Sequence, residues 1–201
     1  MPLLRSPGAP RPASRSSRHA TIRRMSELET AIAENRMAVD EFVATARALG
    51  PSAWTASREE GAWTSAQIVE HVALAYEYSR DVVEGTPSGG SWPRLLRPIL
   101  RRLVVDSTLK AGKFTRKGRA PASFRPSASP PGPSELIDRL NRAVAAFEAA
   151  IRAGQPDGLP TLNHPAFGRM STTDYVRLQA IHSRHHHAQL VAVLPVGVGN
   201  H

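Results

Sequence analysis

The sequence predicts an all-α protein, a four-helix bundle with one long crossover connection. Three observations support this fold class. Several segments carry apolar residues at helical spacing, helix-start and helix-stop signals flank these segments, and no stretch has the alternation typical of a strand. The chain has 201 residues, of which 41% are hydrophobic, which is enough for one domain with a substantial core. Four amphipathic helices of this kind are typical of a bundle.

The first helix is expected from about Ser26 to Leu49. Ser26 and Glu29 have the spacing of a capping box, in which each side chain binds the other residue's backbone amide. Gly50 and Pro51 then end the helix. The apolar stripe of this helix consists of Leu28, Ile32, Val39, Phe42, Val43 and Ala46.

The second helix follows a connector over residues 51–63. Thr64 is its expected cap, and Gln67 completes a second capping box. The helical pattern continues to about Val83, shortly before Gly85. This helix is therefore the best delimited of the four.

The third and fourth helices complete the bundle. The third is expected from about Ser134 to Ala153, where Gly154 ends it. The fourth begins after a capping serine, Ser171, and reaches about Leu194. The apolar positions of the third helix are Leu136, Ile137, Leu140, Val144, Phe147 and Ile151.

An irregular basic insertion over residues 85–133 separates the second and third helices. A connection this long in a compact domain is usually functional or mobile. Trp92 to Val105 within it predicts a short helix. The stretch Arg94–Arg125 has ten Lys or Arg residues against one acid, Asp106. It could bind an anionic thiol or substrate near the site, but we favour a solvated surface.

The positive charge is concentrated at the N-terminus. The formal net charge is +9, and residues 1–24 carry six arginines and no acid. We expect these residues to form a disordered basic tail, with Met25 as a possible true start. An Arg-rich, Ser-rich and acid-free segment also fits a transit peptide. Because the charge lies largely in this tail, nucleic acid is an improbable partner of the folded body.

The sequence lacks cysteine and long apolar runs, which excludes several kinds of site and membrane insertion. The chain has no cysteine, which excludes disulfides, thiolate metal sites and a cysteine nucleophile, and leaves histidine as the main metal ligand. No apolar run approaches the roughly 20 residues needed to span a bilayer, so we expect no membrane insertion.

Three histidines form the candidate site. His71 lies on the apolar stripe of the second helix, while His182 and His186 are four residues apart in the fourth. Residues at this spacing lie one above the other on a single helix face. Two such imidazoles can hold one metal ion, and a third from a neighbouring helix completes a three-histidine site. Open coordination positions would remain, as is typical of a catalytic site.

Other histidines leave alternatives open. Each of the three could instead be a core histidine with its own hydrogen-bond partner, but buried unpartnered imidazoles are costly, and we favour metal. His185, at i+3 from His182, could replace His186 as a ligand. We expect His187 to be solvated, and His164 to be structural in the turn before the fourth helix.

The sequence offers no assured general base. Glu70 adjoins His71 but is rotated from it by about 100° on the helix. The motif His-Glu-x-x-His is absent, because Ser183 and Arg184 follow His182. A protease of the zincin type is therefore disfavoured.

The histidine segments resemble the DinB-like superfamily of metal-binding four-helix bundles. The resemblance covers about residues 26–195 in helix order. In that family one histidine of the second helix and an H-x-x-x-H pair of the last helix hold the metal. The resemblance thus implies His71, His182 and His186 as ligands. The matching segments are Trp63-Thr-Ser-Ala-Gln-Ile-Val-Glu-His71, His164-Pro-Ala-Phe-Gly168 and Ile181-His-Ser-Arg-His-His-His-Ala-Gln-Leu190.

This resemblance also implies a chemistry. Relatives include thiol S-transferases that use bacillithiol or mycothiol, and a mycothiol-dependent maleylpyruvate isomerase. It implies zinc or nickel as the metal, a low-molecular-weight thiol as a further cofactor, and a domain over residues 25–198. We expect a cytoplasmic, metal-dependent thiol S-transferase or hydrolase with a small-molecule substrate. A homodimer is compatible with relatives that pair through helix faces.

Two other functions compete with this expectation. The first is a metal-binding or stress-associated bundle without turnover. The second, which we rank last, is a nucleic-acid-associated protein that acts through its basic tail, because no interleaving of aromatic and basic residues supports base stacking.

Overall fold

The computed structural model describes residues 15–87, 93–115, 120–154 and 161–194. Four long helices form most of it, and we refer to them as the bundle: α1 (Arg15–Ala48), α3 (Ser65–Glu84), α6 (Pro133–Ala153) and α7 (Thr172–Val191). The expected helical-bundle class is confirmed. None of the helices in these ranges combines the length and apolar character that a membrane span requires.

Helix α1 begins earlier than its sequence signals indicate. It runs without interruption from Arg15, so residues 15–24, expected in a disordered tail, are helical. Ser26 therefore lies inside the helix, where its carbonyl accepts a hydrogen bond from Thr30 Oγ1 at 2.8 Å, and the predicted capping box at Ser26 is wrong. Residues 1–14 of the expected tail lie outside the described residues.

The start of α3 follows its sequence closely. The backbone amide of Gln67 donates to Thr64 Oγ1 at 3.3 Å, and Gln67 Oε1 accepts from the Thr64 amide at 3.0 Å. This is the predicted capping box. At the other end Gly85 has a φ of 78°, a left-handed conformation in which glycine carries no steric penalty.

Helices α6 and α7 lie close to their predicted bounds. Pro133 occupies the first turn of α6, where its missing amide hydrogen costs nothing. Ser171 caps α7, because its hydroxyl oxygen accepts from the Asp174 amide at 3.0 Å.

The short elements between the long helices were only partly foreseen. The connector after α1 contains α2 (Pro51–Thr55), and the basic insertion contains α4 (Arg97–Leu100), a π-helical turn (Arg101–Asp106), α5 (Ser107–Ala111) and the 3₁₀ helix η2 (Ala122–Phe124). The expected short helix at residues 92–105 thus exists in part, and Trp92 lies outside the described residues.

One small sheet corrects the expectation that the chain has no strands. Strands β1 (Thr161–His164) and β2 (Gly168–Ser171) pair antiparallel, with Leu162 opposite Met170. Both of these side chains are buried, so the hairpin packs its apolar face on the bundle. Four-residue strands are too short for an alternation pattern to identify, and pairing and packing decide them instead.

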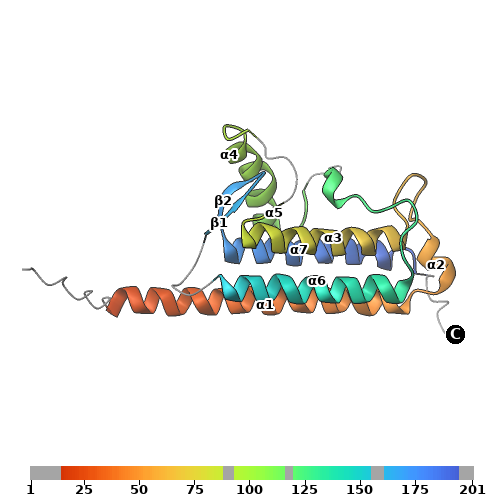
Figure 1. Cartoon of the computed structure of the whole chain (residues 1–201), viewed down its shortest axis with the longest axis horizontal. Helices are drawn as coiled ribbons and strands as arrows, with labels where there is room; N and C mark the ends of the chain where they lie inside the picture. The colour runs from red at the N-terminus through yellow and green to blue at the C-terminus, as the bar shows by residue number, and fades with distance from the viewer. Residues whose placement is uncertain (1–14, 88–92, 116–119, 155–160, 195–201) are drawn as a thin grey trace, which may run out of the picture.

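The four long helices form two layers (Figure 1). Helices α3 and α7 lie in one layer and α1 and α6 in the other, with α1 packed mainly on α7 and α3 mainly on α6. Helices α3 and α6 run in the same direction, so the chain must return along the bundle between them (Figure 1). The long insertion makes this crossover, as predicted.

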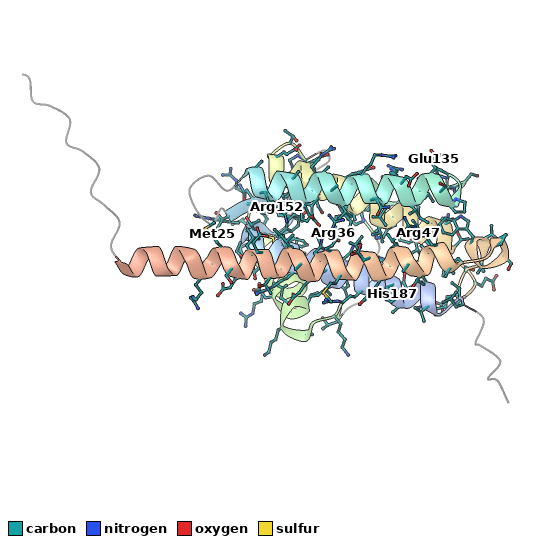
Figure 2. The ribbon with its side chains drawn as sticks, turned by 90° about the horizontal axis from the view of Figure 1, so that it is seen from below. Met25, Arg36, Arg47, Glu135, Arg152 and His187 are labelled. Atoms are coloured by element: carbon teal, nitrogen blue, oxygen red, sulfur yellow. The ribbon has the colours of Figure 1, made fainter. Side chains whose placement is uncertain are left out.

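The core lies between the four long helices. Its largest fully buried side chains include Phe42, Tyr76, Phe147 and Tyr175, one from each long helix. Figure 2 shows Arg36 and Arg152 on the side where α1 and α6 lie next to each other. An ion pair joins these two helices, since Arg36 Nη2 lies 2.7 Å from an oxygen of Glu148.

Candidate metal centre

His71 reaches the centre of the candidate site from the first half of α3. Only 5% of its surface is exposed. Its Nδ1 lies 2.6 Å from the backbone carbonyl oxygen of Phe124, in the 3₁₀ helix of the insertion. A carbonyl can only accept, so Nδ1 carries the hydrogen and Nε2 keeps its lone pair. The indole ring of Trp63 lies against the imidazole, with ring centroids 4.7 Å apart.

His182 and His186 come from successive turns of α7. Their ring centroids lie 4.6 Å apart, as the i,i+4 spacing requires. His186 is buried, and its Nδ1 lies 2.8 Å from Gln189 Oε1, so this nitrogen also donates and leaves Nε2 as a free acceptor. His182 Nδ1 is buried without a hydrogen-bond partner among the described residues.

The three imidazoles meet where α3 and α7 come together. Each offers one ring nitrogen, and these nitrogens lie within 4.8 Å of one another. Nε2 of His71 and Nε2 of His182 are 3.2 Å apart. Two nitrogens that bind one ion at about 2.0–2.1 Å with near-tetrahedral angles stand about 3.3 Å apart. The distance between these two nitrogens is thus close to the distance expected for two ligands of one ion.

Burial lowers the pKa of each of the three imidazoles. It is the largest cause that lowers the pKa of His71, and it lowers the pKa of His182 well below the usual range. Burial, together with the neighbouring His71, lowers the pKa of His186 to about 3. All three rings are therefore neutral at pH 7, which is the form that binds metal.

Burial distinguishes His186 from its neighbour His185, although Gln189 contacts both rings. The side chain of His185 is exposed, and its Nε2 accepts from Gln189 Nε2 at 3.2 Å, whereas His186 is buried inside the cluster. The alternative in which His185 joins the site is thus not the arrangement seen. That His71, His182 and His186 bind metal stays a prediction.

Two further described histidines, His164 and His187, lie apart from the cluster. His187 was expected to be solvated, but it is half-buried, and its Nε2 lies 2.9 Å from Thr45 Oγ1 of α1. Figure 2 places it on the side of α7 that faces α1. His164 is buried at the end of β1, where its ring stacks on Phe167 and its Nδ1 accepts from the Ala166 amide at 3.1 Å. A structural role for His164 agrees with these contacts.

Several residues around the cluster carried no sequence signal. The carbonyl of Phe124 belongs to an irregular insertion, and a backbone oxygen can be supplied by any residue type. Phe114 was equally unforeseen, with its ring 6.1 Å from that of His182. Gln189 is the exception, because it lies at i+3 from His186 on the same helix, and amide side chains often orient metal-binding histidines.

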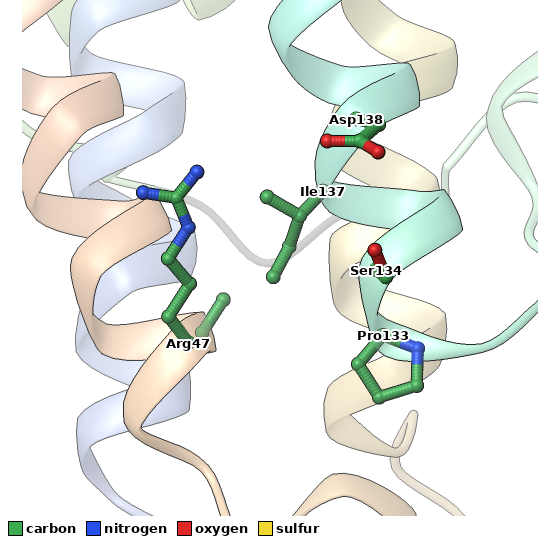
Figure 3. Close-up of a pocket in the computed structure, with 6 residues that line it drawn as sticks. Arg47, Pro133, Ser134, Ile137 and Asp138 are labelled. Carbon is green, nitrogen blue, oxygen red and sulfur yellow. The ribbon is translucent and has the colours of Figure 1, made fainter.

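A cavity away from the histidine cluster is lined by α1 and α6. It has a volume of about 290 Å³ between the C-terminal end of α1 and the N-terminal end of α6 (Figure 3). Arg47 and Asp138 are its charged lining residues, and no histidine of the cluster lines it. We therefore assign the cavity no part in the candidate metal centre.

A comparison with protein families finds one match. The model of a family described as a protein of unknown function, DUF1569, matches residues 17–193, which is most of the chain and includes all three clustered histidines. No curated protein and no solved structure matches the chain.

Proposed function

The chain belongs to the DUF1569 family, and from that premise we propose that it is a metal-dependent enzyme of the DinB-like type. His71, His182 and His186 hold one divalent ion, zinc or nickel, in this proposal. The observation that supports it is the convergence of three neutral imidazoles from two helices, with their ring nitrogens within 4.8 Å of one another. The helical bundle and its crossover agree with the same superfamily.

The reaction we propose is activation of a small-molecule thiol or of water. A divalent ion held by three histidines supplies open coordination positions and lowers the pKa of the group that enters them. Because the chain has no cysteine, a thiol must come from a small molecule. We propose thiol S-transfer first and hydrolysis second. The cytoplasm, where low-molecular-weight thiols are kept reduced, is the compartment this chemistry needs.

The protein's own contribution is to orient the ligands. The Phe124 carbonyl and the Gln189 side chain fix Nδ1–H of His71 and His186, which directs Nε2 of each ring as the lone-pair donor. Such contacts commonly set the tautomer and ring orientation of metal-binding histidines. Trp63 and Phe114 place aromatic surface beside the rings, which lowers the local dielectric and strengthens charge interactions.

A metal-binding bundle without turnover is the second candidate. The favouring observation is that Glu70, the acid next to His71, already binds Ser127 through Oε2. Glu70 is therefore engaged elsewhere and does not serve as a base for the cluster.

Metal content tests the proposal directly. The full chain is purified without a histidine tag, and bound elements are quantified by mass spectrometry, before and after reconstitution with zinc and with nickel. We expect about one ion per chain, and none in the His71→Ala variant. A loaded protein is then assayed for transfer of small thiols to electrophiles and for ester and amide hydrolysis. No metal after reconstitution would refute the proposal, and metal without turnover would establish the second candidate.

A further inference from the structure

The segment that carries the Phe124 carbonyl has one close ring contact with the bundle, since the Phe124 ring lies edge-on to that of Tyr78 with centroids 4.8 Å apart. Of residues 121–127, only Phe124 and Pro126 are half-buried, and the others are exposed. Yet the Phe124 carbonyl oxygen must stay within hydrogen-bond distance of His71 Nδ1 to orient that ring. Exposed segments with few packed side chains are the parts of a protein that open most readily, so contacts in addition to this ring pair stabilise the position of the carbonyl.

Polar side chains of α3 supply those contacts. Glu70 Oε2 accepts from the Ser127 amide at 2.7 Å and from the Ser127 hydroxyl at 3.0 Å. Gln67 Nε2 donates to the Ser127 carbonyl at 3.2 Å. Residues 67, 70 and 71 lie within one turn of α3. His71 contacts the segment at Phe124, and Gln67 and Glu70 contact it at Ser127.

The carboxylate that makes this contact, Glu70, is buried, and burial of a charged group costs desolvation free energy. Only 6% of its surface is exposed, and a buried carboxylate is unfavourable unless its oxygens are hydrogen-bonded. Its second oxygen lies 3.7 Å from Arg139 Nη1, and Arg139 is itself bound by both oxygens of Glu77 at 2.7 and 2.8 Å. The Glu70 carboxylate is therefore fixed from α6 on one side and holds the insertion on the other.

We propose that Glu70 is a positioning residue for the metal centre: it clamps Ser127 so that the Phe124 carbonyl keeps His71 in the tautomer and orientation that present Nε2 to the ion. The inference rests on the proposed metal site. It assigns a role to a residue that the helix geometry directs away from the cluster, and it makes the insertion part of the site.

The test compares variants that remove the contact between the Glu70 carboxylate and Ser127, which we call the clamp. Glu70→Ala removes the acceptor from the bundle side, and Ser127→Pro removes the amide and hydroxyl donors from an exposed residue outside the long helices. Glu77→Ala is the matched control, since it also removes a partner of Arg139 but does not touch the segment. Zinc affinity is measured by competition with a chromogenic chelator, and helix content by circular dichroism.

We expect Glu70→Ala and Ser127→Pro each to weaken zinc binding by up to about ten- to a hundred-fold, the effect of losing an outer partner of a metal ligand, because without the Glu70–Ser127 contact the Phe124 carbonyl moves away from His71 Nδ1. Glu77→Ala should change the affinity by less than about two-fold. Wild-type affinity in both clamp variants would overturn the inference.

A metal-free readout separates this inference from the proposed function. Nitrogen–proton correlation spectra of the imidazoles report the His71 tautomer in the protein without metal. The wild type should show the Nδ1–H form, and Glu70→Ala a mixture of both forms. If the wild type binds no metal, the metal function fails, but this spectrum still decides whether Glu70 positions His71. An unchanged tautomer would overturn the clamp in that case as well.

Discussion

Nε2 of His71 and Nε2 of His182 lie 3.2 Å apart, although one residue belongs to α3 and the other to α7. Nδ1 of His71 donates to Phe124, so without metal the hydrogen between the two Nε2 atoms belongs to His182. The Nδ1 of His182 is then left as a buried acceptor without a partner among the described residues. An ion held through Nε2 of both rings would take the place of this hydrogen bond, and Nδ1 of His182 would then carry the hydrogen of that ring.

The first prediction concerns which histidine of the triple run binds metal. His186→Ala should lose stoichiometric zinc, because it removes a ring buried in the cluster, while His185→Ala should keep it, because that ring is exposed. Elemental analysis of the two purified variants decides between them. Zinc retained in His186→Ala and lost in His185→Ala would reverse the assignment.

The second prediction concerns metal and stability. An ion that binds the folded chain and not the unfolded one stabilises it, by about 2.7 kcal/mol at a free concentration a hundred times the dissociation constant. Zinc should therefore raise the thermal midpoint of the wild type and leave that of His71→Ala unchanged. Differential scanning calorimetry with and without a chelator measures this difference, and an equal rise in both proteins would indicate binding elsewhere.

The third prediction concerns acid stability through His164. Burial lowers the pKa of His164 to about 4 in the folded protein, below the usual value of 6.5. Protonation therefore favours the unfolded chain, so stability is complete above about pH 6.5 and falls as the pH drops toward 4. By linkage this one group should cost about 2 kcal/mol at pH 5 relative to pH 7.

His164→Gln should remove that part of the pH dependence. Urea unfolding of chelator-treated wild type and variant at pH 7 and pH 5 gives the comparison. Because both proteins keep the other histidines, the difference between their pH dependences isolates His164. Parallel losses in the two proteins would show that His164 does not titrate as its burial requires.

The fourth prediction concerns a polar contact in the core near the candidate metal centre. Tyr76 is fully buried, and its hydroxyl donates to Asn35 Oδ1 at 2.6 Å and lies 3.0 Å from Ser183 Oγ. Tyr76→Phe leaves the Asn35 oxygen without this donor and should lower the free energy of unfolding by about 1–2 kcal/mol. Tyr78→Phe, on a half-buried ring of the same helix, is the control and should change it by less than about 0.5 kcal/mol. Equal effects in the two variants would contradict the role given to the Tyr76 hydroxyl.

Capping residues in the sequence predicted the ends of two helices correctly, α3 and the start of α7. The Thr64–Gln67 capping box and the left-handed Gly85 delimit α3, and Ser171 caps α7, because each of these contacts lies within one helical turn. The same type of signal at Ser26 was misleading. A capping motif is satisfied only if the chain before it leaves the helix, and the residues before Ser26 continue it.

Helical periodicity likewise placed His71, His182 and His186 on inward-facing stripes, since spacing along one helix determines which face a side chain occupies. The sequence by itself thus determined the bundle, its crossover and the candidate ligands. Only the tertiary structure decided the rest: the β1–β2 hairpin, the choice of His186 over His185 within the cluster, and the clamp from Glu70 through Ser127 to the Phe124 carbonyl. The strands of the hairpin are too short for an alternation pattern. The other two features depend on residues far apart in the chain, and a local pattern carries no information on which distant groups will meet.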